Sequence, residues 1–171
     1  MNKFSQEEWV QINRFYQWYQ ELKPQLTMPP ELNIYSLTYL YAGTLDFVCK
    51  IEKGTYNVGS AKKQEIEEGI YIGDLKTGKG IDINYSRQLA AYAFAFEEMA
   101  GEKIQGAFVL HTQADTRQGW KMIILTQEEL EIHFQTFLHA FEVWKNENQS
   151  LTPVIFDMPA KIQLFKDKEA L

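Results

Sequence analysis

Along this chain the spacing of apolar residues changes repeatedly between the period of a helix and the period of a strand. Apolar residues three and four positions apart indicate an amphipathic helix, whereas short runs rich in β-branched and aromatic residues indicate strands. The chain therefore predicts helices over residues 5–23 and 85–100 and from 126 onward, and strands over 32–41, 45–51, 69–76, 104–111 and 120–125. This order, α-β-β-β-α-β-β-α, predicts one mixed α/β domain in which helices pack against a sheet.

The first expected helix begins at a capping-box pair, Ser5 with Glu8 three residues later. An apolar stripe follows it at helical spacing and consists of Trp9, Ile12, Tyr16 and Tyr19, widened by Phe15, Trp18 and Leu22. Such a wide stripe predicts a helix clamped between other elements, and we expect most of the 4 tryptophans of the chain to lie in the core. We expect a break in the first strand pair near residues 41–43 and a polar hairpin loop over 53–68.

With 171 residues the chain is long enough for one domain with one sizeable core. We expect the centre of this domain at residues 31–145, preceded by the helix over 5–23 and followed by a tail over 150–171 that has no assigned role. A single cysteine, Cys49, excludes an internal disulfide and is expected to be buried. No run approaches the ~18 apolar residues of a membrane span, and the N-terminus lacks the apolar centre of a signal peptide. We therefore expect a cytoplasmic protein with no membrane partner.

Acidic residues outnumber basic residues, 23 to 17, which gives the chain a formal net charge of −6. Nucleic-acid binders usually carry a basic excess, so this balance alone argues against a polyanionic partner. An enzyme that holds divalent metal on carboxylates is an exception, because the metal itself attracts phosphates. The function thus depends on whether acidic residues gather at one site.

Three charged residues stand where two of the expected strands end. Asp74 and Lys76 are two positions apart and therefore point to the same face of their strand. If that strand pairs with residues 45–51, Asp46 faces the same place. Two carboxylates there form a hard-oxygen site suited to Mg²⁺ or Mn²⁺, and a neighbouring lysine stabilises developing negative charge. This combination predicts metal-assisted hydrolysis of a phosphodiester.

The helix after this strand adds polar residues to the same region. Gln88 and Tyr92 are four positions apart and share a helix face, and Arg87 is adjacent. The loop between strand and helix is short, so the first turns of the helix lie close to the strand end. A glutamine there is able to bond a water at the metal or a DNA phosphate, with the tyrosine bracing it.

These residues resemble the motifs of the RecB-like branch of the PD-(D/E)XK nucleases, which read G-x-x-D, (D/E)-x-K and Q-x-x-x-Y. The matching segments, in the same order, are Gly43-Thr44-Leu45-Asp46, Asp74-Leu75-Lys76 and Gln88-Leu89-Ala90-Ala91-Tyr92. Each motif alone is weak, whereas the three in order on strand, strand and helix are fairly specific. The resemblance implies a restriction-endonuclease-like fold, a mixed β-sheet flanked by helices, and an activity like that of phage-type exonucleases in DNA recombination or repair.

The resemblance also implies a role for each matching residue. Asp46, Asp74 and the main-chain carbonyl of Leu75 match the ligands of Mg²⁺ or Mn²⁺, and Lys76 matches the catalytic lysine. The residues that match or adjoin the family's contacts to substrate are Arg87, Gln88, Tyr92 and Lys79, and Glu31 matches a peripheral glutamate before the first strand. The implied partner is DNA, at ends or as a single strand. Whether the chain forms a homo-oligomer or acts with a recombination partner protein stays open.

The sequence departs from the family pattern upstream. Relatives often carry a histidine or glutamate on an N-terminal helix that completes the metal site, but this chain has no histidine before His111. The acidic residues of its first helix are Glu7, Glu8 and Glu21. Either one of these completes the site, or the site lacks that ligand. The second alternative describes a non-catalytic DNA-binding or assembly module, and a third is an unrelated α/β enzyme in which the motifs are coincidental.

Overall fold

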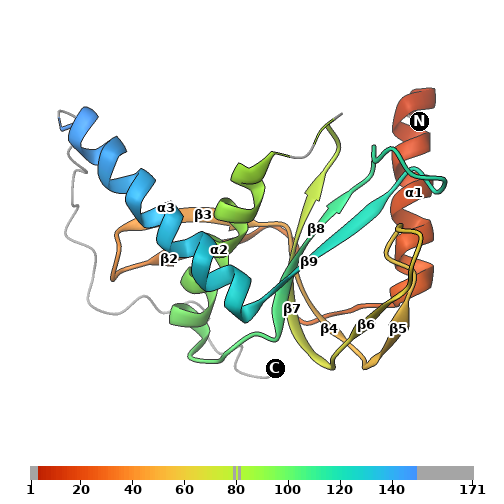
Figure 1. Ribbon diagram of the computed structural model, residues 1–171, viewed down its shortest axis with the longest axis horizontal. Coiled ribbons are helices and arrows are strands. Elements are labelled where there is room, and N and C mark those ends of the chain that lie inside the picture. Colours follow the sequence, from red (N-terminus) through yellow and green to blue (C-terminus); the bar gives the residue numbers. More distant parts are fainter. Residues whose placement is uncertain (1–3, 79, 81, 150–171) are drawn as a thin grey trace, which may run out of the picture.

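The computed structural model describes residues 4–78, 80 and 82–149, and it consists of a sheet with helices on both faces (Figure 1). The helices are α1 (Gln6–Leu22), α2 (Ile83–Ala100) and α3 (Gln127–Glu147). The strands are β1 (Gln25–Leu26), β2 (Leu32–Ser36), β3 (Tyr41–Leu45), β4 (Phe47–Ile51), β5 (Gly54–Tyr56), β6 (Gln64–Ile66), β7 (Gly69–Lys76), β8 (Gly106–His111) and β9 (Lys121–Thr126). The predicted mixed α/β architecture is confirmed.

The main sheet has five strands in the order β1-β4-β7-β8-β9. β7 and β8 are parallel, and the other neighbouring pairs are antiparallel. A parallel pair requires a crossover connection, and α2 supplies it between β7 and β8. The predicted pairing of the strand around residue 48 with the strand that ends at Lys76 is confirmed, because β4 pairs with β7.

Alternate residues of the central strands point to opposite faces of the sheet. Val48, Ile72 and Val109 pack with α2 and α3, whereas Phe47 and Phe108 pack with α1 on the other face. The molecule therefore has three layers, α1, the sheet, and α2 with α3 (Figure 1). Two apolar clusters, one on each face of the sheet, form the core.

The prediction of where the first strand pair breaks is wrong. The chain turns at residues 37–40, and residues 41–43, the expected break, belong to the strand Tyr41–Leu45. β2 and β3 pair with each other in a separate two-stranded sheet, and Tyr41 of this hairpin donates a hydrogen bond to the Ala91 carbonyl of α2, 2.7 Å away. The expected polar loop over 53–68 also contains a short hairpin, β5 with β6.

The prediction for the apolar stripe of α1 is wrong as well. Trp9, Ile12, Tyr16 and Tyr19 are 51, 41, 57 and 42% exposed. The neighbouring residues Trp18 and Leu22 form the buried side of the helix instead. Of the 4 tryptophans, Trp18 and Trp120 lie in the core, whereas Trp9 and Trp144 are about half exposed. α1 thus packs through one edge of its aromatic surface and presents the rest to solvent.

The predicted helix starts agree with the structure to within about two residues. The capping box of Ser5 and Glu8 is confirmed, and Thr126 with Glu129 forms another at the start of α3. α2 begins at Ile83, two residues before the expected start, because Asp82 caps it. Each cap satisfies backbone N–H groups that the first helical turn leaves without a partner.

Cys49 is buried and free of disulfide bonding, as expected, and burial raises the pKa of its thiol to about 12. Among residues 4–78, 80 and 82–149, no helix combines the length and the apolarity that a membrane crossing requires. The tail over 150–171 lies outside the described residues, so its role stays unassigned.

Candidate active site

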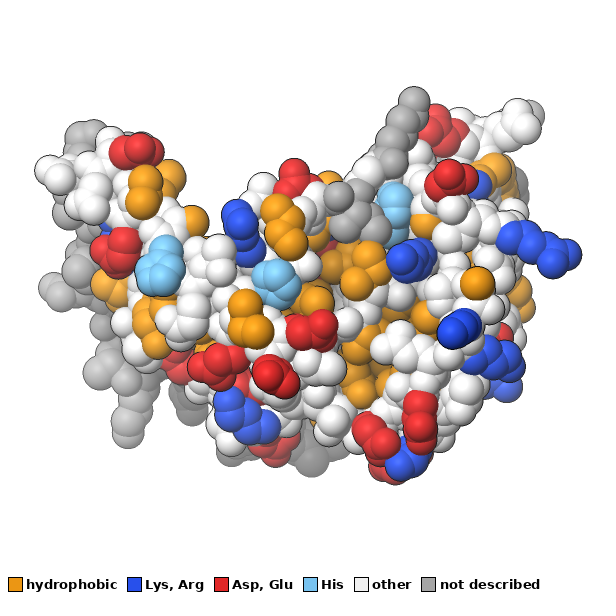
Figure 2. Space-filling view, in the orientation of Figure 1, with side chains coloured by type: hydrophobic (Ala, Val, Ile, Leu, Met, Phe, Trp, Pro, Cys, Tyr) orange, Lys and Arg blue, Asp and Glu red, His pale blue; other side chains and the backbone are white. Residues whose placement is uncertain are grey.

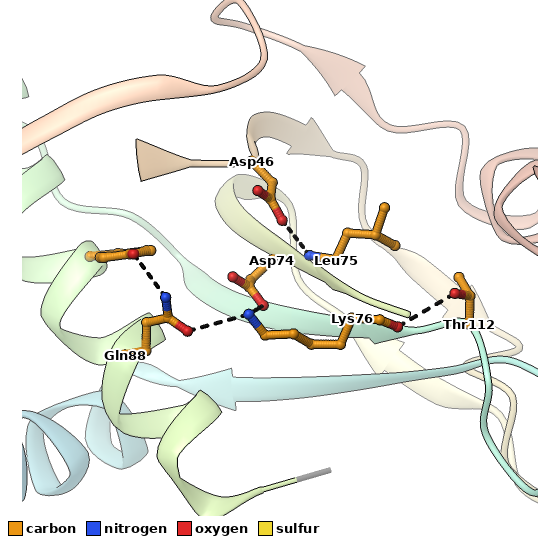
Figure 3. A network of polar contacts seen from close by, with 7 residues as sticks. Asp46, Asp74, Leu75, Lys76, Gln88 and Thr112 are labelled. Atoms are coloured by element: carbon orange, nitrogen blue, oxygen red, sulfur yellow. Dashed lines mark hydrogen bonds and ion pairs between the residues drawn. The ribbon is translucent and has the colours of Figure 1, made fainter. Parts of the chain in front are cut away.

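The two predicted aspartates come together at the end of the β4–β7 pair. Asp46 occupies the bend just before β4, and the register that pairs Phe47 with Gly73 brings Asp46 opposite Asp74. Asp46 Oδ2 accepts a hydrogen bond of 2.6 Å from the backbone N–H of Leu75 (Figure 3). This bond fixes the Asp46 carboxylate beside the last residues of β7, so Asp46 is not a free surface side chain at the end of a strand.

Asp74 and Lys76 form an ion pair on the same face of β7, as predicted. Lys76 Nζ lies 2.7 Å from Asp74 Oδ2, and the two side chains are 19% and 7% exposed (Figure 3). Within the described part of the chain, Lys76 is the partner of this buried oxygen. A metal ion at Asp74 Oδ2 would therefore replace the ammonium group of Lys76 there.

The surroundings of Asp74 disfavour its charged form. Burial raises the pKa of Asp74 above its ordinary value of 3.8, the negative charge of Asp46 acts in the same direction, and Lys76 opposes both. Lys76 offsets only part of the cost of this burial, because the net shift in the pKa of Asp74 is upward. The folded protein therefore stores unfavourable electrostatic energy at this position.

We expect Asp74→Asn to stabilise the metal-free protein at neutral and alkaline pH. Because the folded pKa of Asp74 lies above its unfolded value, its contribution is favourable below about pH 3.8 and is lost as pH rises through the folded pKa. The variant should melt about 2–4 °C higher at pH 8, the shift that about 1 kcal/mol causes at this size, with the difference shrinking toward pH 4. Thermal denaturation in EDTA measures both. Exposed Asp115→Asn is the control, and a pH-independent difference would contradict the prediction.

Helix α2 brings two further predicted residues into the network. Gln88 Oε1 accepts from Lys76 Nζ at 3.3 Å, and Gln88 Nε2 donates to the hydroxyl of Tyr92 at 2.8 Å (Figure 3). The ring of Tyr85 lies against the same ammonium group, with Nζ 4.7 Å from the ring centroid. Lys76 is thus held by a carboxylate, an amide and an aromatic face.

The glycine of the first motif makes room for the tyrosine of the third. A Cβ atom on Gly43 would contact the Tyr92 ring, 2.9 Å from Cζ and 3.0 Å from the hydroxyl oxygen. Such a distance is shorter than real Cβ contacts allow, so the ring would have to move. A glycine at position 43 therefore allows β3 to pack closely against α2, three residues before Asp46.

We expect Gly43→Ala to displace the Tyr92 ring and to break its hydrogen bond with Gln88. The cost should be about 1 kcal/mol, at the low end for overpacking because the displaced atoms are the outer part of a side chain. Urea denaturation measures the cost. Gly78→Ala is the matched control, since its Cβ would have no heavy atom within 4 Å. Equal stability of the two variants would show that Gly43 has no packing role.

His111 of β8 and Thr112, which follows β8, contact the backbone at and just after the end of β7, and the sequence did not predict the contact of Thr112. The backbone N–H of Thr112 donates to the Lys76 carbonyl at 3.0 Å, and Thr112 is 1% exposed. His111, expected to be structural, lies opposite Lys76 in the parallel pair, and its Nε2 is 2.6 Å from the Gly78 carbonyl. Arg14 of α1 donates to the Thr112 carbonyl at 2.8 Å. The feature of the sequence that could have indicated this role of Thr112 is its position just after the predicted strand over 104–111.

Other predicted residues do not join this network. Arg87 donates to Asn84 one turn earlier on α2, at 3.0 Å, and Lys79 lies outside the described residues. On α1, Glu8 is engaged in the capping box, and Glu21 accepts from the backbone N–H of Asn57 at 2.8 Å. Glu7 lies in a shallow hollow near the start of α1, with Arg14 and Gln113. In the described residues no group of three or more His, Cys, Asp or Glu is arranged to hold a metal.

The donor set of the site suits a hard divalent cation. Asp46 and Asp74 supply carboxylate oxygens, and Asp74 Oδ2 would exchange its ion pair with Lys76 for the metal. Mg²⁺ in proteins is commonly held by one or two carboxylates together with waters and substrate phosphates. Two carboxylates therefore fit this ion without a third acidic ligand from α1.

Comparison with known proteins assigns no family to this chain. No protein-family model matches the sequence, and no curated protein matches it significantly.

Proposed function

We propose that the chain is a divalent-metal-dependent deoxyribonuclease with the restriction-endonuclease-like fold, of the RecB-like PD-(D/E)XK branch. The observation that carries the proposal is the network that joins Asp46, Asp74, Lys76 and Gln88 at the end of β7. Carboxylates for metal, a lysine beside them and an amide from the next helix are the groups that phosphodiester hydrolysis requires. The mixed sheet with an α2 crossover is compatible with this fold.

Each group has a role that its contacts make feasible. Asp46, Asp74 and the Leu75 carbonyl would hold Mg²⁺ or Mn²⁺, which supplies Lewis-acid stabilisation of the phosphate and a more acidic water. Lys76 gives up its ion pair with Asp74 and donates from Nζ to the attacking water or to the phosphate oxygens. Gln88, braced by Tyr92, holds this ammonium group at the end of β7 when the ion pair with Asp74 is released.

The charge distribution favours binding of DNA at one small site and not over a broad surface. On the face drawn in Figure 2, basic side chains are scattered among acidic ones, with no continuous basic area among the described residues. With a net charge of −6, attraction of the DNA backbone over a broad surface is weak. We therefore propose that the substrate is a DNA end or a single strand, held at the metal. The proposed compartment is the cytoplasm.

A cleavage assay with metal exchange tests the proposal. The purified chain is incubated with end-labelled linear duplex, single-stranded and closed circular DNA in Mg²⁺, Mn²⁺ or EDTA, while calorimetry measures Mn²⁺ binding. We expect Mn²⁺ binding and cleavage that stops in EDTA, with linear or single-stranded DNA preferred over closed circles. Asp74→Asn is expected to lose both, and exposed Asp115→Asn neither. Cleavage of equal rate in EDTA would overturn the metal-dependent assignment.

A non-catalytic DNA-binding or assembly module is the second candidate. The observation that favours it is that Glu8 and Glu21 of α1 are engaged elsewhere, so neither adds a third ligand. This candidate predicts that the chain binds DNA but does not cleave it, and that calorimetry detects no heat of Mn²⁺ binding. The same two measurements therefore separate it from the nuclease.

A further inference from the structure

A pocket of about 460 Å³ lies between α1 and the sheet, next to the candidate active site. Most of its lining is aromatic or aliphatic and includes Phe15, Trp18 and Tyr19 of α1 and Leu26 of β1. Its carboxylates are Glu31 and Asp46. A volume in this range, with apolar walls and a few polar groups, is typical of sites for small organic groups.

The side chains of the pocket differ in accessibility from floor to mouth. Trp18 is 2% exposed, and Phe47 is 9% exposed, so both form the closed inner wall. Tyr19 and Leu26 are 42% and 58% exposed and remain open to an incoming molecule. The opening is therefore lined by a ring that is free to stack with a ligand.

The pocket and the candidate active site share residues. Asp46 and Leu75 belong to the pocket lining, and the same two residues are joined by the 2.6 Å hydrogen bond that fixes Asp46. Leu75 packs with the apolar cluster on the α1 face, whereas Asp74 and Lys76 are on the alternate face of β7. Asp46 therefore connects the pocket with the candidate active site.

Glu31 is held in position beside Asp46. Its backbone N–H donates to the Asp46 carbonyl at 3.0 Å, and its φ of 58° lies in the left-handed region, which non-glycine residues rarely adopt. Such a conformation persists only where the surroundings maintain it. Glu31 is exposed at the pocket lining, where its carboxylate is able to accept hydrogen bonds from amino groups.

We propose that this pocket binds an unpaired nucleobase of the DNA strand whose phosphate lies at Asp46 and Asp74. The inference rests on the proposed function and names the form of substrate that the site selects. A base is neutral and flat, so it stacks on an aromatic side chain such as Tyr19, and the exocyclic amino group of adenine, guanine or cytosine is a donor for Glu31. A base within a duplex is paired and stacked, so the pocket selects single strands or frayed ends.

The experiment uses a short single-stranded oligonucleotide that carries 2-aminopurine at its terminal position, with Ca²⁺ present to limit cleavage. Stacking in the pocket should quench the 2-aminopurine fluorescence on addition of the protein. Tyr19→Ala should weaken this binding by roughly 10-fold, within the range for loss of one base–aromatic stack. Tyr16→Ala is the matched control, because Tyr16 is an exposed tyrosine of the same helix outside the pocket lining. Its affinity should equal that of the unmodified protein.

A second variant keeps the test decisive if Tyr19→Ala does not fold. Leu26→Glu places a charge at the exposed mouth, where no core packing is lost, and should weaken oligonucleotide binding to a similar degree. Unquenched 2-aminopurine, or equal binding by the Tyr19 and Tyr16 variants, would overturn the pocket assignment. An apolar dye that fills the pocket and is not displaced by the oligonucleotide would also overturn it.

The outcomes for the pocket and for the nuclease are separable. Cleavage of DNA by a protein whose Tyr19→Ala variant binds the oligonucleotide normally would refute the pocket and leave the nuclease intact. Selective loss of quenching in Tyr19→Ala, without cleavage by any of the proteins, would leave a nucleobase-binding pocket and refute the nuclease.

Discussion

Lys76→Ala is expected to reduce metal-dependent DNA cleavage by about 10²–10³-fold, the usual effect of removing one preorganised donor from a reacting centre. The ammonium group is 2.7 Å from Asp74 and 3.3 Å from Gln88 Oε1, so alanine removes the cation to which both are directed. Mn²⁺ binding should persist, because neither carboxylate changes. Initial rates on linear DNA, with calorimetric titration of Mn²⁺, measure the two effects separately.

Lys50→Ala is the matched control for this experiment. Lys50 is also a strand lysine in an ion pair, 2.6 Å from Glu68, but it lies in the part of the β4–β7 pair opposite Ile70 and away from the site. Its substitution should leave the cleavage rate within about twofold, because exposed ion pairs contribute little. Robust activity of Lys76→Ala at the level of this control would refute the catalytic role of Lys76.

Asp46→Ala is expected to abolish measurable Mn²⁺ binding and to destabilise the fold. The carboxylate accepts the backbone N–H of Leu75 at 2.6 Å, and a hydrogen bond to a charged group contributes about 1.5–3 kcal/mol. The variant thus loses a proposed metal ligand and leaves the N–H of Leu75 without its acceptor. Urea denaturation and calorimetry, both at pH 7.5, report on these two losses.

Asp46→Asn separates the two roles of this residue. The amide oxygen of asparagine is able to accept from Leu75, so the free energy of unfolding should return to within about 1 kcal/mol of the unmodified protein. An amide is neutral, so Mn²⁺ binding and cleavage should remain weak. Full Mn²⁺ binding by Asp46→Asn would show that Asp46 orients β7 without being a ligand.

Much of this fold was predictable because its apolar pattern is local. The short apolar runs of β4 and β7 predicted two strands of the sheet, and the two-residue spacing of Asp74 and Lys76 predicted their common face. The capping residues Ser5 and Thr126 predicted two helix starts. The functional assignment of the site remains a proposal, although its side chains are close together.

The wrong predictions concern segments whose burial or pairing depends on residues that are distant in sequence. On α1, Trp9 and Trp18 both belong to an almost continuous aromatic surface, so periodicity did not distinguish the side that would pack. Trp18 is buried because Phe47 and Phe108 surround it on the sheet face, a contact that the sequence of α1 does not encode. Similarly, β3 pairs with β2, and α2 packs on that hairpin, so a strand formed where a local pattern indicated a break.

The network at the end of β7 joins contacts of very different sequence range, which has a consequence for the order of folding. Lys76 and Gln88 are 12 residues apart and Gln88 and Tyr92 are 4 apart, whereas Asp46 and Leu75 are 29 apart. Short-range contacts require less chain entropy to close, so the β7–α2 unit should form before Asp46 docks. During refolding the lysine side of the network should be assembled first, and competence to bind metal should appear last.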